Sequence, residues 1–243
     1  MNAPTVAAPQ NPAINPIAYA FSMLWLYTKR PFLLRRVRRT TIERVDDVAV
    51  VVSPDILNPV VFRSGEFFAR AVASEETAAP PAACAEPRLL DMGTGSGICA
   101  IFGARRGYRV TAVDLNPEAV RYARVNAMLN RLEDRIEVAQ SDLFEALSGQ
   151  RFDLILFNPP FFRGEPKSKF DMAWRSKDVF ERFAAGLDGA LTPDGRALVL
   201  LSTDGDAAGM LRALQENGFR SVPAVRRNYG NEVMTIYAVE RQP

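Results

Sequence analysis

From Arg88 onward, short apolar runs alternate with longer runs of helical character, and this order limits the fold more than any other feature of the chain. The expected strands cover residues 89–90, 109–113, 136–139, 152–157, 197–202, 221–227 and 233–239. The expected helices cover residues 98–106, 117–129, 178–191 and 207–217, with a shorter helical stretch at 143–147. Alternation at this spacing favours a doubly wound, mostly parallel sheet with helices on both faces. The sequence therefore predicts an α/β fold with a seven-stranded sheet and an antiparallel hairpin at one edge.

The chain before residue 46 differs from the rest in composition. Residues 1–16 contain four prolines and are predicted to be a disordered leader. Residues 17–45 are predicted to be a short helical and basic N-terminal extension. Residues 46–243 are assigned to one α/β domain, since a chain of this length buries a single core. That domain is expected to begin with a strand at 48–52, a helix at 67–73 and a surface connection at 74–87.

The N-terminal extension has an apolar half and a basic half. The apolar run 17–27 is eleven residues long, about half of what spans a bilayer. It is either an interfacial membrane helix or, as we favour, a helix packed over the α/β domain. The basic half carries Lys29, Arg30, Arg35, Arg36, Arg38, Arg39 and Arg44 against one acid, Glu43. These side chains can contact RNA phosphates or an acidic partner, or they are simply solvated.

Two residue types exclude whole classes of chemistry. The chain contains no histidine, so Ser-His-Asp hydrolysis, Cys-His proteolysis and histidine-ligated zinc are excluded. Its two cysteines, Cys84 and Cys99, have neither metal-site spacing nor a disulfide framework. No metal site is therefore expected, and a reducing cytoplasm is the expected location.

A glycine-rich turn follows the first strand of the alternating region and reads Asp91-Met92-Gly93-Thr94-Gly95-Ser96-Gly97. Glycines let the backbone turn tightly and approach a ligand. In doubly wound sheets, ligands bind beyond the carboxyl ends of the strands. The polar residues that follow the next three strands are Asp114, Asp142 and Asn158. We expect these residues and the turn to line one ligand site.

The acids around this turn discriminate between two nucleotide-like ligands. A dinucleotide fingerprint is G-x-G-x-x-G, whereas this turn reads G-T-G-S-G-I, and Asp91 would repel a pyrophosphate. Asp91 suits an ammonium group, and Asp114 can accept hydrogen bonds from both hydroxyls of a ribose. Asp142 can accept from an adenine amine beside the apolar wall of Leu143 and Phe144. Ammonium, ribose and adenine together describe S-adenosylmethionine.

The run Asn158-Pro159-Pro160-Phe161 ends the fourth strand and predicts the chemistry of the acceptor. The carbonyl oxygens of the Asn158 side chain and of the adjacent backbone can accept hydrogen bonds from a planar NH2 group. The prolines hold the turn rigid because they fix φ near −65°. The aromatic ring of Phe161 can stack on a flat amide or base. The run therefore favours a planar amine or amide over a carboxylate or a phosphate.

Taken together, these motifs resemble the motif series of class I S-adenosylmethionine-dependent methyltransferases, which share a Rossmann-like fold. More narrowly, they are similar to the branch that holds the protein N5-glutamine methyltransferases and the N6-adenine and N2-guanine methyltransferases, the methyltransferase small domain. The resemblance covers about residues 48–240. It implies an enzyme with S-adenosylmethionine as its cofactor.

The resemblance also implies roles for individual residues. The implied cofactor-binding residues are Asp91, Gly93, Thr94, Gly95, Gly97, Asp114, Leu115, Asp142, Leu143 and Asn158. The implied catalytic residues, which hold the nitrogen to be methylated, are Asn158, Pro159, Pro160 and Phe161. Gly65-Glu66 occupies the place of a short element that borders the cofactor in this family.

Two departures from the release-factor enzymes of this branch bear on the acceptor. Only about 45 residues precede the first expected strand, where those enzymes carry a full helical domain. Their motif commonly ends in Tyr, whereas this one continues as Phe161-Phe162, a pattern also frequent among nucleic-acid base methyltransferases. We favour a protein glutamine side chain as acceptor, with a nucleic-acid base or a small biosynthetic metabolite as alternatives. Intact Asn158 argues against a non-catalytic, cofactor-binding scaffold.

Overall fold

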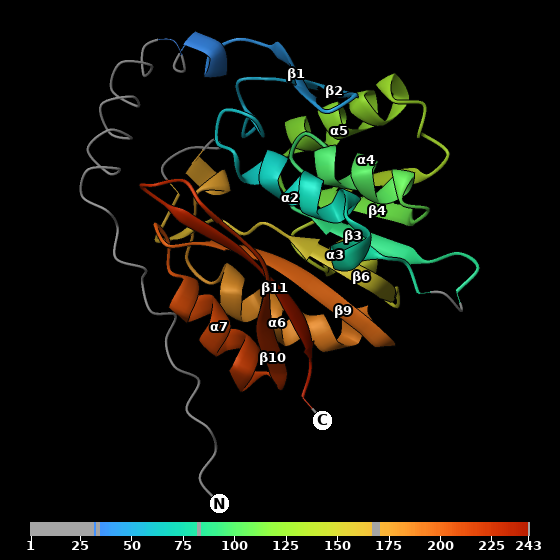
Figure 1. The fold of residues 1–243 in the computed structure, drawn as a ribbon, viewed down its shortest axis with the longest axis vertical. Coiled ribbons are helices and arrows are strands. Elements are labelled where there is room, and N and C mark those ends of the chain that lie inside the picture. The colour runs from blue at the N-terminus through green and yellow to red at the C-terminus, as the bar shows by residue number, and fades with distance from the viewer. Residues whose placement is uncertain (1–31, 33–34, 82–83, 167–170, 243) are drawn as a thin grey trace, which may run out of the picture.

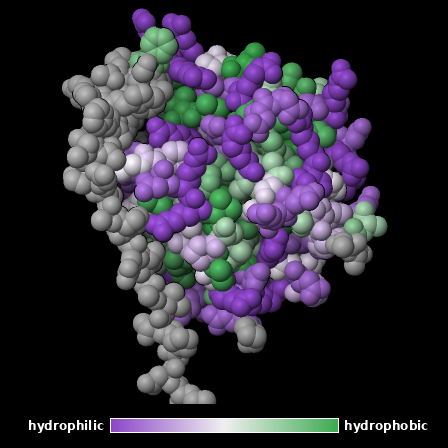
Figure 2. Space-filling model, in the orientation of Figure 1, coloured by the Kyte–Doolittle hydropathy of each residue, from purple (hydrophilic) through white to green (hydrophobic). Residues whose placement is uncertain are grey.

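The computed structural model describes the chain except for residues 1–31, 33–34, 82–83, 167–170 and 243. The expected leader and the apolar run 17–27 lie outside the described residues. Polar residues cover most of the face turned to the viewer in Figure 2, with smaller apolar groups between them. No helix in the described part of the chain has the length and apolar character needed to cross a membrane.

A seven-stranded sheet forms the centre of the molecule, in the order β10-β11-β9-β6-β3-β4-β5 (Figure 1). Its strands are β3 (Arg88–Met92), β4 (Arg109–Asp114), β5 (Ile136–Gln140), β6 (Phe152–Phe157), β9 (Leu191–Ser202), β10 (Phe219–Asn228) and β11 (Val233–Arg241). The first five are parallel to one another, and β11 pairs antiparallel with both β9 and β10. The predicted sheet with its antiparallel edge hairpin is confirmed.

Helices cover both faces of this sheet (Figure 1). On one face lie α2 (Ser64–Ala73), α4 (Ile98–Arg105) and α5 (Pro117–Leu129), and on the other lie α6 (Val179–Ala190) and α7 (Ala207–Glu216). Side chains of β6 alternate between the two layers, because successive residues of a strand point to opposite faces. Leu154 and Leu156 join the core of the first layer, and Ile155 and Phe157 join that of the second.

Short elements complete the fold. The short helix α3 (Glu75–Ala78) interrupts the expected surface connection, and its Thr77 and Ala78 are buried. The expected helical stretch at 143–147 is a 3-10 helix at Glu145–Leu147, and a second one covers Asp171–Ala173. The pair β7 (Phe162–Arg163) and β8 (Arg175–Ser176) follows the Asn-Pro-Pro run.

The N-terminal segment differs from the expectation at its end. Residues 41–45 form a strand, β1 (Thr41–Val45), rather than part of a helical extension. It pairs antiparallel with β2 (Val48–Val52), and Asp46 adopts a φ of 53° in the turn between them. Glu43 and Val45 are buried and Arg44 between them is exposed. This alternation is the period of a strand with one covered face. The sequence did not predict this strand, because the segment was interpreted by its many basic residues rather than by this alternation.

One buried amide attaches the β1–β2 hairpin to the rest of the fold. The Asn126 side chain of α5 is fully buried, and its Oδ1 accepts from the Val51 amide at 2.7 Å. Its Nδ2 donates to the carbonyl oxygens of Val51 at 2.9 Å and Ser96 at 2.8 Å. A single side chain therefore joins the hairpin, the glycine turn and α5.

We expect Asn126→Ala to lower the free energy of unfolding by about 3 kcal/mol, because the buried Ser96 carbonyl and the partly buried N–H and carbonyl of Val51 lose their partner. Urea denaturation measures this loss. Asn217→Ala is the matched control, since its amide donates only to Ala213 in its own helix, and it should cost less than about 1 kcal/mol. Equal losses in the two variants would contradict the joining role of Asn126.

Candidate active site

The carboxyl ends of the central strands open into one cavity. The loops after β3, β4, β5 and β6 all contribute to its lining, as expected for a doubly wound sheet. Of the predicted site residues, those that line it are Asp91, Gly93, Thr94, Gly95, Asp114, Leu115, Asp142, Leu143, Asn158 and Pro160. Gly97, Pro159 and Phe161 are not part of this lining.

The glycine turn has the backbone conformation that its sequence predicts. Gly93, Gly95 and Gly97 have φ values of 68°, 55° and 79°, which glycine adopts far more readily than other residues. A Cβ on Gly97 would lie 3.2 Å from the backbone of Ala123, so Gly97 also lets α4 and α5 approach each other. Gly93 is exposed at the cavity, with open space where a side chain would be. A ligand can therefore reach the backbone there.

Asp91 is the buried acid of the site, with only 4% of its surface exposed. Its Oδ2 accepts hydrogen bonds from the Thr94 hydroxyl at 2.6 Å and from the Ala100 amide at 3.0 Å. The second bond satisfies a free N–H at the start of α4. Burial raises the pKa of the Asp91 carboxyl to about 6, against the lowering effect of these two bonds. A cationic group in the cavity would favour its ionised form.

Asp114 at the end of β4 is held from two sides. Its Oδ2 accepts from the Gly95 amide and its Oδ1 from the Asn116 amide, both at 2.9 Å. Burial raises the pKa of this carboxyl, and these backbone bonds oppose the shift. Each carboxylate oxygen has a second lone pair, so both can accept further bonds from a pair of hydroxyls.

The third acid, Asp142, follows β5 and pairs with Arg182 of α6 at 2.9 Å. Arg182 also lines the cavity and was not predicted from the sequence. Beside this pair, Leu143 is buried with a φ of 49°. Its carbonyl accepts from the Ser141 hydroxyl at 2.8 Å, which fixes the turn. The result is an apolar side chain next to an acid at the mouth of the cavity.

The Asn158-Pro159-Pro160-Phe161 run divides between two environments. Asn158 lines the cavity, and its Nδ2 donates to the Ser64 hydroxyl of α2 at 3.3 Å. Pro159 is buried. Phe161 is also buried and lines a neighbouring cavity, and its carbonyl accepts from the Asp206 amide at 3.0 Å. Of the predicted catalytic residues, Asn158 and Pro160 thus lie together with the three acids.

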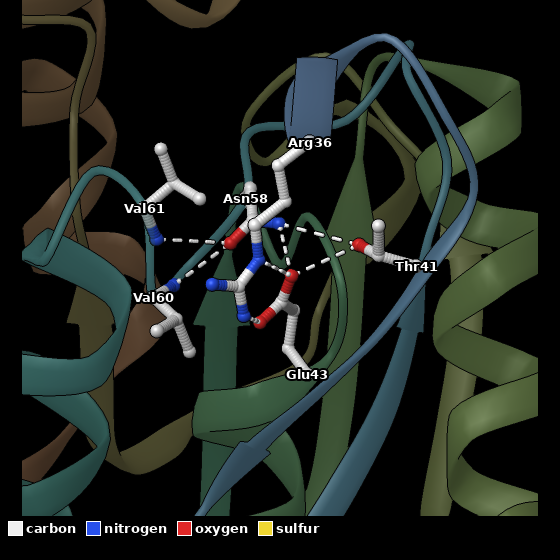
Figure 3. Close-up of polar contacts among 6 residues, drawn as sticks. All are labelled: Arg36, Thr41, Glu43, Asn58, Val60 and Val61. Atoms are coloured by element: carbon white, nitrogen blue, oxygen red, sulfur yellow. Dashed lines mark hydrogen bonds and ion pairs between the residues drawn. The ribbon is translucent and has the colours of Figure 1, made fainter. Parts of the chain in front are cut away.

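An ion pair from the N-terminal segment holds a loop that lines the cavity, and Figure 3 shows this ion pair with its hydrogen bonds. Glu43 of β1 is buried and accepts from Arg36 through both carboxylate oxygens, and from Asn58 at 2.8 Å. Asn58 in turn accepts from the amides of Val60 and Val61. The same loop carries Ile56, Leu57 and Pro59 over the cavity. The one acid in the basic run was the sequence signal for this network.

The lining fits S-adenosylmethionine and does not fit a pyrophosphate. Three carboxylates line the cavity together with Arg175 and Arg182, which pair with Asp171 and Asp142. A pyrophosphate at the glycine turn would be repelled by Asp91 and Asp114. An ammonium matches Asp91, a diol matches the two oxygens of Asp114, and an adenine amine matches Asp142 beside Leu143. Among the described residues, no group of acids and cysteines is arranged to hold a metal ion.

Comparisons with known proteins place this fold and site in a family. The family model of the methyltransferase small domain matches residues 77–234, which is more than half of the chain. A protein of Methanocaldococcus jannaschii, named as a protein N5-glutamine methyltransferase, is 33% identical over 141 residues, covering 54% of this chain and 70% of the relative. The tRNA1(Val) (adenine(37)-N6)-methyltransferase of Porphyromonas gingivalis is 33% identical over 135 residues, covering 51% and 53%.

A solved structure gives the same result. TrmN from Thermus thermophilus matches with a TM-score of 0.55 and 26% identity, over 76% of this chain and 49% of that one. The chain thus spans about half the length of TrmN and of the P. gingivalis enzyme. Fold, site and family together define an S-adenosylmethionine-dependent methyltransferase. The chain belongs to the methyltransferase small domain family, and the predicted fold, cofactor and enzyme class are confirmed.

We expect Asp91→Asn to stabilise the protein and to weaken cofactor binding. The folded pKa lies above that of the unfolded chain, so the wild type loses stability as the pH rises from 4 through 6. The amide avoids this loss of about 3 kcal/mol, so at pH 7 the variant should melt about 6 to 12 °C higher. The two proteins should melt alike at pH 4. Thermal melts at both pH values measure the difference.

Cofactor affinity should fall at least about tenfold in the same variant, since a charge-assisted bond to the ammonium is lost. Asp188→Asn is the control, because Asp188 is a surface acid paired with Arg241. An Asp91→Asn protein that melts below the wild type at pH 7 would show that the carboxylate is a net stabilising group.

Proposed function

We propose that this enzyme transfers a methyl group to a planar amide or amino nitrogen bound at Asn158, with a protein glutamine side chain as the favoured acceptor. The observation that carries the proposal is the position of Asn158. Its side chain lies at the end of β6, in the same cavity as Asp91 and Asp114. The glutamine acceptor is supported by the relative named as an N5-glutamine methyltransferase.

The orientation of Asn158 suits an acceptor NH2 group. Its Nδ2 is committed to the Ser64 hydroxyl, so Oδ1 at the other end of the amide is left to accept a hydrogen bond. The sequence predicts that the Pro159 carbonyl accepts the second N–H; Pro159 is buried and does not line the cavity, so this second acceptor stays a prediction. Two acceptors on a rigid turn would direct the nitrogen lone pair at the methyl carbon, and such positioning accounts for a large part of a rate enhancement.

S-adenosylmethionine would be held by Asp91, Asp114 and Asp142, and it would supply a sulfonium methyl group as the donor for the nitrogen positioned by Asn158. The nitrogen then releases one proton to water, which needs no histidine. Apolar residues around the cavity, Ile56, Phe68 and Phe157 among them, exclude water from the reacting atoms.

A nucleic-acid base is the second candidate acceptor. Arg35, Arg38, Arg39 and Arg44 are exposed at the N-terminal segment, where they could contact phosphates. The P. gingivalis relative is named as a tRNA adenine-N6 methyltransferase. We also propose the domain limits given by the sequence, with the α/β domain at residues 46–243, and a cytoplasmic location for the protein.

We expect Asn158→Ala to lower methyl transfer by about 100-fold or more, because the acceptor nitrogen loses its orientation. Affinity for S-adenosylmethionine should stay within about threefold, a difference of less than 1 kcal/mol. Transfer of labelled methyl is measured into three pools: protein, RNA and small molecules. Asp114→Ala provides the converse control, since it should lose affinity first. Matched losses of affinity and transfer in Asn158→Ala would reject the assignment.

A further inference from the structure

A second cavity, of 360 Å³, lies beside the first. Ser64, which accepts the hydrogen bond from Asn158, lines both cavities. Pro160 lines the first, and the next residue, Phe161, lines the second. Ser64 and the step from Pro160 to Phe161 therefore belong to the boundary between the two cavities, and an acceptor whose nitrogen reaches Asn158 lies next to the second cavity.

The walls of the second cavity are largely aromatic and apolar. They are formed by Val60, Val61, Phe62, Phe161, Phe162, Trp174 and Met234. The rings of Phe62 and Trp174 pack edge to face with centroids 4.9 Å apart, which holds both in place. Such walls suit a flat or aliphatic segment.

Three hydrogen-bond acceptors, Asp204, Asn231 and Glu232, line the cavity between these walls. Glu232 is half-buried, and its Oε1 accepts from the Ser202 hydroxyl at 2.5 Å. Asp204 is exposed at the mouth. The Oδ1 atom of Asn231 is buried and has no hydrogen-bond partner among the described residues. A buried acceptor without a partner is costly, and an N–H donor that reached this atom would remove that cost.

The charge in this cavity opposes phosphate. Burial raises the pKa of the Glu232 carboxyl, and the neighbouring Asp204 carboxylate adds to the effect. Arg36 is committed to Glu43 through its Nε and Nη2 atoms. Arg63 stacks over the Tyr229 ring at 5.1 Å and partly offsets Glu232. A phosphate would thus face two carboxylates, whereas an N–H donor would find three acceptors.

We propose that the second cavity binds the part of the methyl acceptor next to the reacting nitrogen, and that this part carries amide or ammonium N–H donors and no phosphate. The inference rests on the proposed function, because the reacting nitrogen is taken to lie at Asn158. A protein segment and a free amine metabolite share this chemistry. An RNA does not, since its backbone would carry phosphates past Asp204 and Glu232.

The test is calorimetric binding to the full chain saturated with S-adenosylhomocysteine, with four probes. Two carry the expected chemistry: a blocked peptide with glutamine between two lysines, and 5-aminopentanamide. The third is the same peptide with glutamates in place of the lysines, and the fourth is an RNA heptamer centred on adenine. We expect the lysine peptide or 5-aminopentanamide to bind, and the one that binds identifies the source. The glutamate peptide should bind about tenfold more weakly or not at all.

Glu232→Gln should lower the affinity for the amide probe that binds the wild type by about tenfold or more, since a charge-assisted hydrogen bond is lost. It should leave the affinity for S-adenosylmethionine unchanged, because Glu232 does not line the first cavity. The Ser202 hydroxyl can still donate to the glutamine carbonyl, so the variant should fold. Asp204→Asn at the exposed mouth is a second variant with the same expected direction. Glu240→Gln is the matched control, since Glu240 pairs with Arg220 outside the cavity.

Binding of the RNA heptamer, or failure of both amide probes to bind, would overturn the inference. The inference would also be overturned if Glu232→Gln left the affinity for the bound amide probe unchanged. Failure of the proposed function is distinguishable from these results, because it appears as absence of methyl transfer to all three pools by the wild-type enzyme. If transfer to RNA or to another acceptor occurs while the amide probes do not bind, only the inference about the second cavity fails.

Discussion

The carboxylate of Asp91 is buried between β3 and α4, where it accepts from the Thr94 hydroxyl and the Ala100 amide. These two bonds fix where the glycine turn begins and where α4 starts. They also hold a carboxyl in a place that raises its pKa to about 6. The rest of the site is arranged around this turn, since Asp114 binds the Gly95 amide and Asn126 binds the Ser96 carbonyl. The raised pKa means that an ionised Asp91 costs stability at neutral pH, and a cation bound beside it would offset this cost.

A second level of organisation comes from the N-terminal segment. Its Glu43 holds Asn58, and Asn58 holds the loop that covers the cofactor cavity. Arg36 of the same network also lines the second cavity. The segment before the α/β domain therefore shapes both cavities, and the Asn158-Pro159-Pro160-Phe161 run forms the boundary between them. The first cavity is thus lined by three acids, and the second, which we propose for the acceptor, has largely aromatic and apolar walls.

Local sequence signals were enough to predict the sheet and the first residues of the site. The helix Pro117–Leu129 and the strand Phe152–Phe157 have the predicted bounds, because a proline at N1 and a continuous apolar run mark them. Asp91, Asp114 and Asn158 were found because each follows a strand. Ser64 and Arg182 were missed, since they reach the site through contacts distant in sequence. The placement of Phe161 in the neighbouring cavity was also missed, and its carbonyl is bonded to Asp206, 45 residues away, which no local pattern contains.

The central claim is that the acids at the carboxyl ends of β3, β4 and β5 form a cavity for S-adenosylmethionine rather than for a dinucleotide. Calorimetric titration of the full chain with S-adenosylmethionine, and with NADH in parallel, tests this most directly. We predict micromolar binding of S-adenosylmethionine that Asp114→Ala weakens about tenfold or more, and no binding of NADH. Preferential binding of NADH, or S-adenosylmethionine affinity that is unchanged in Asp114→Ala, would contradict it.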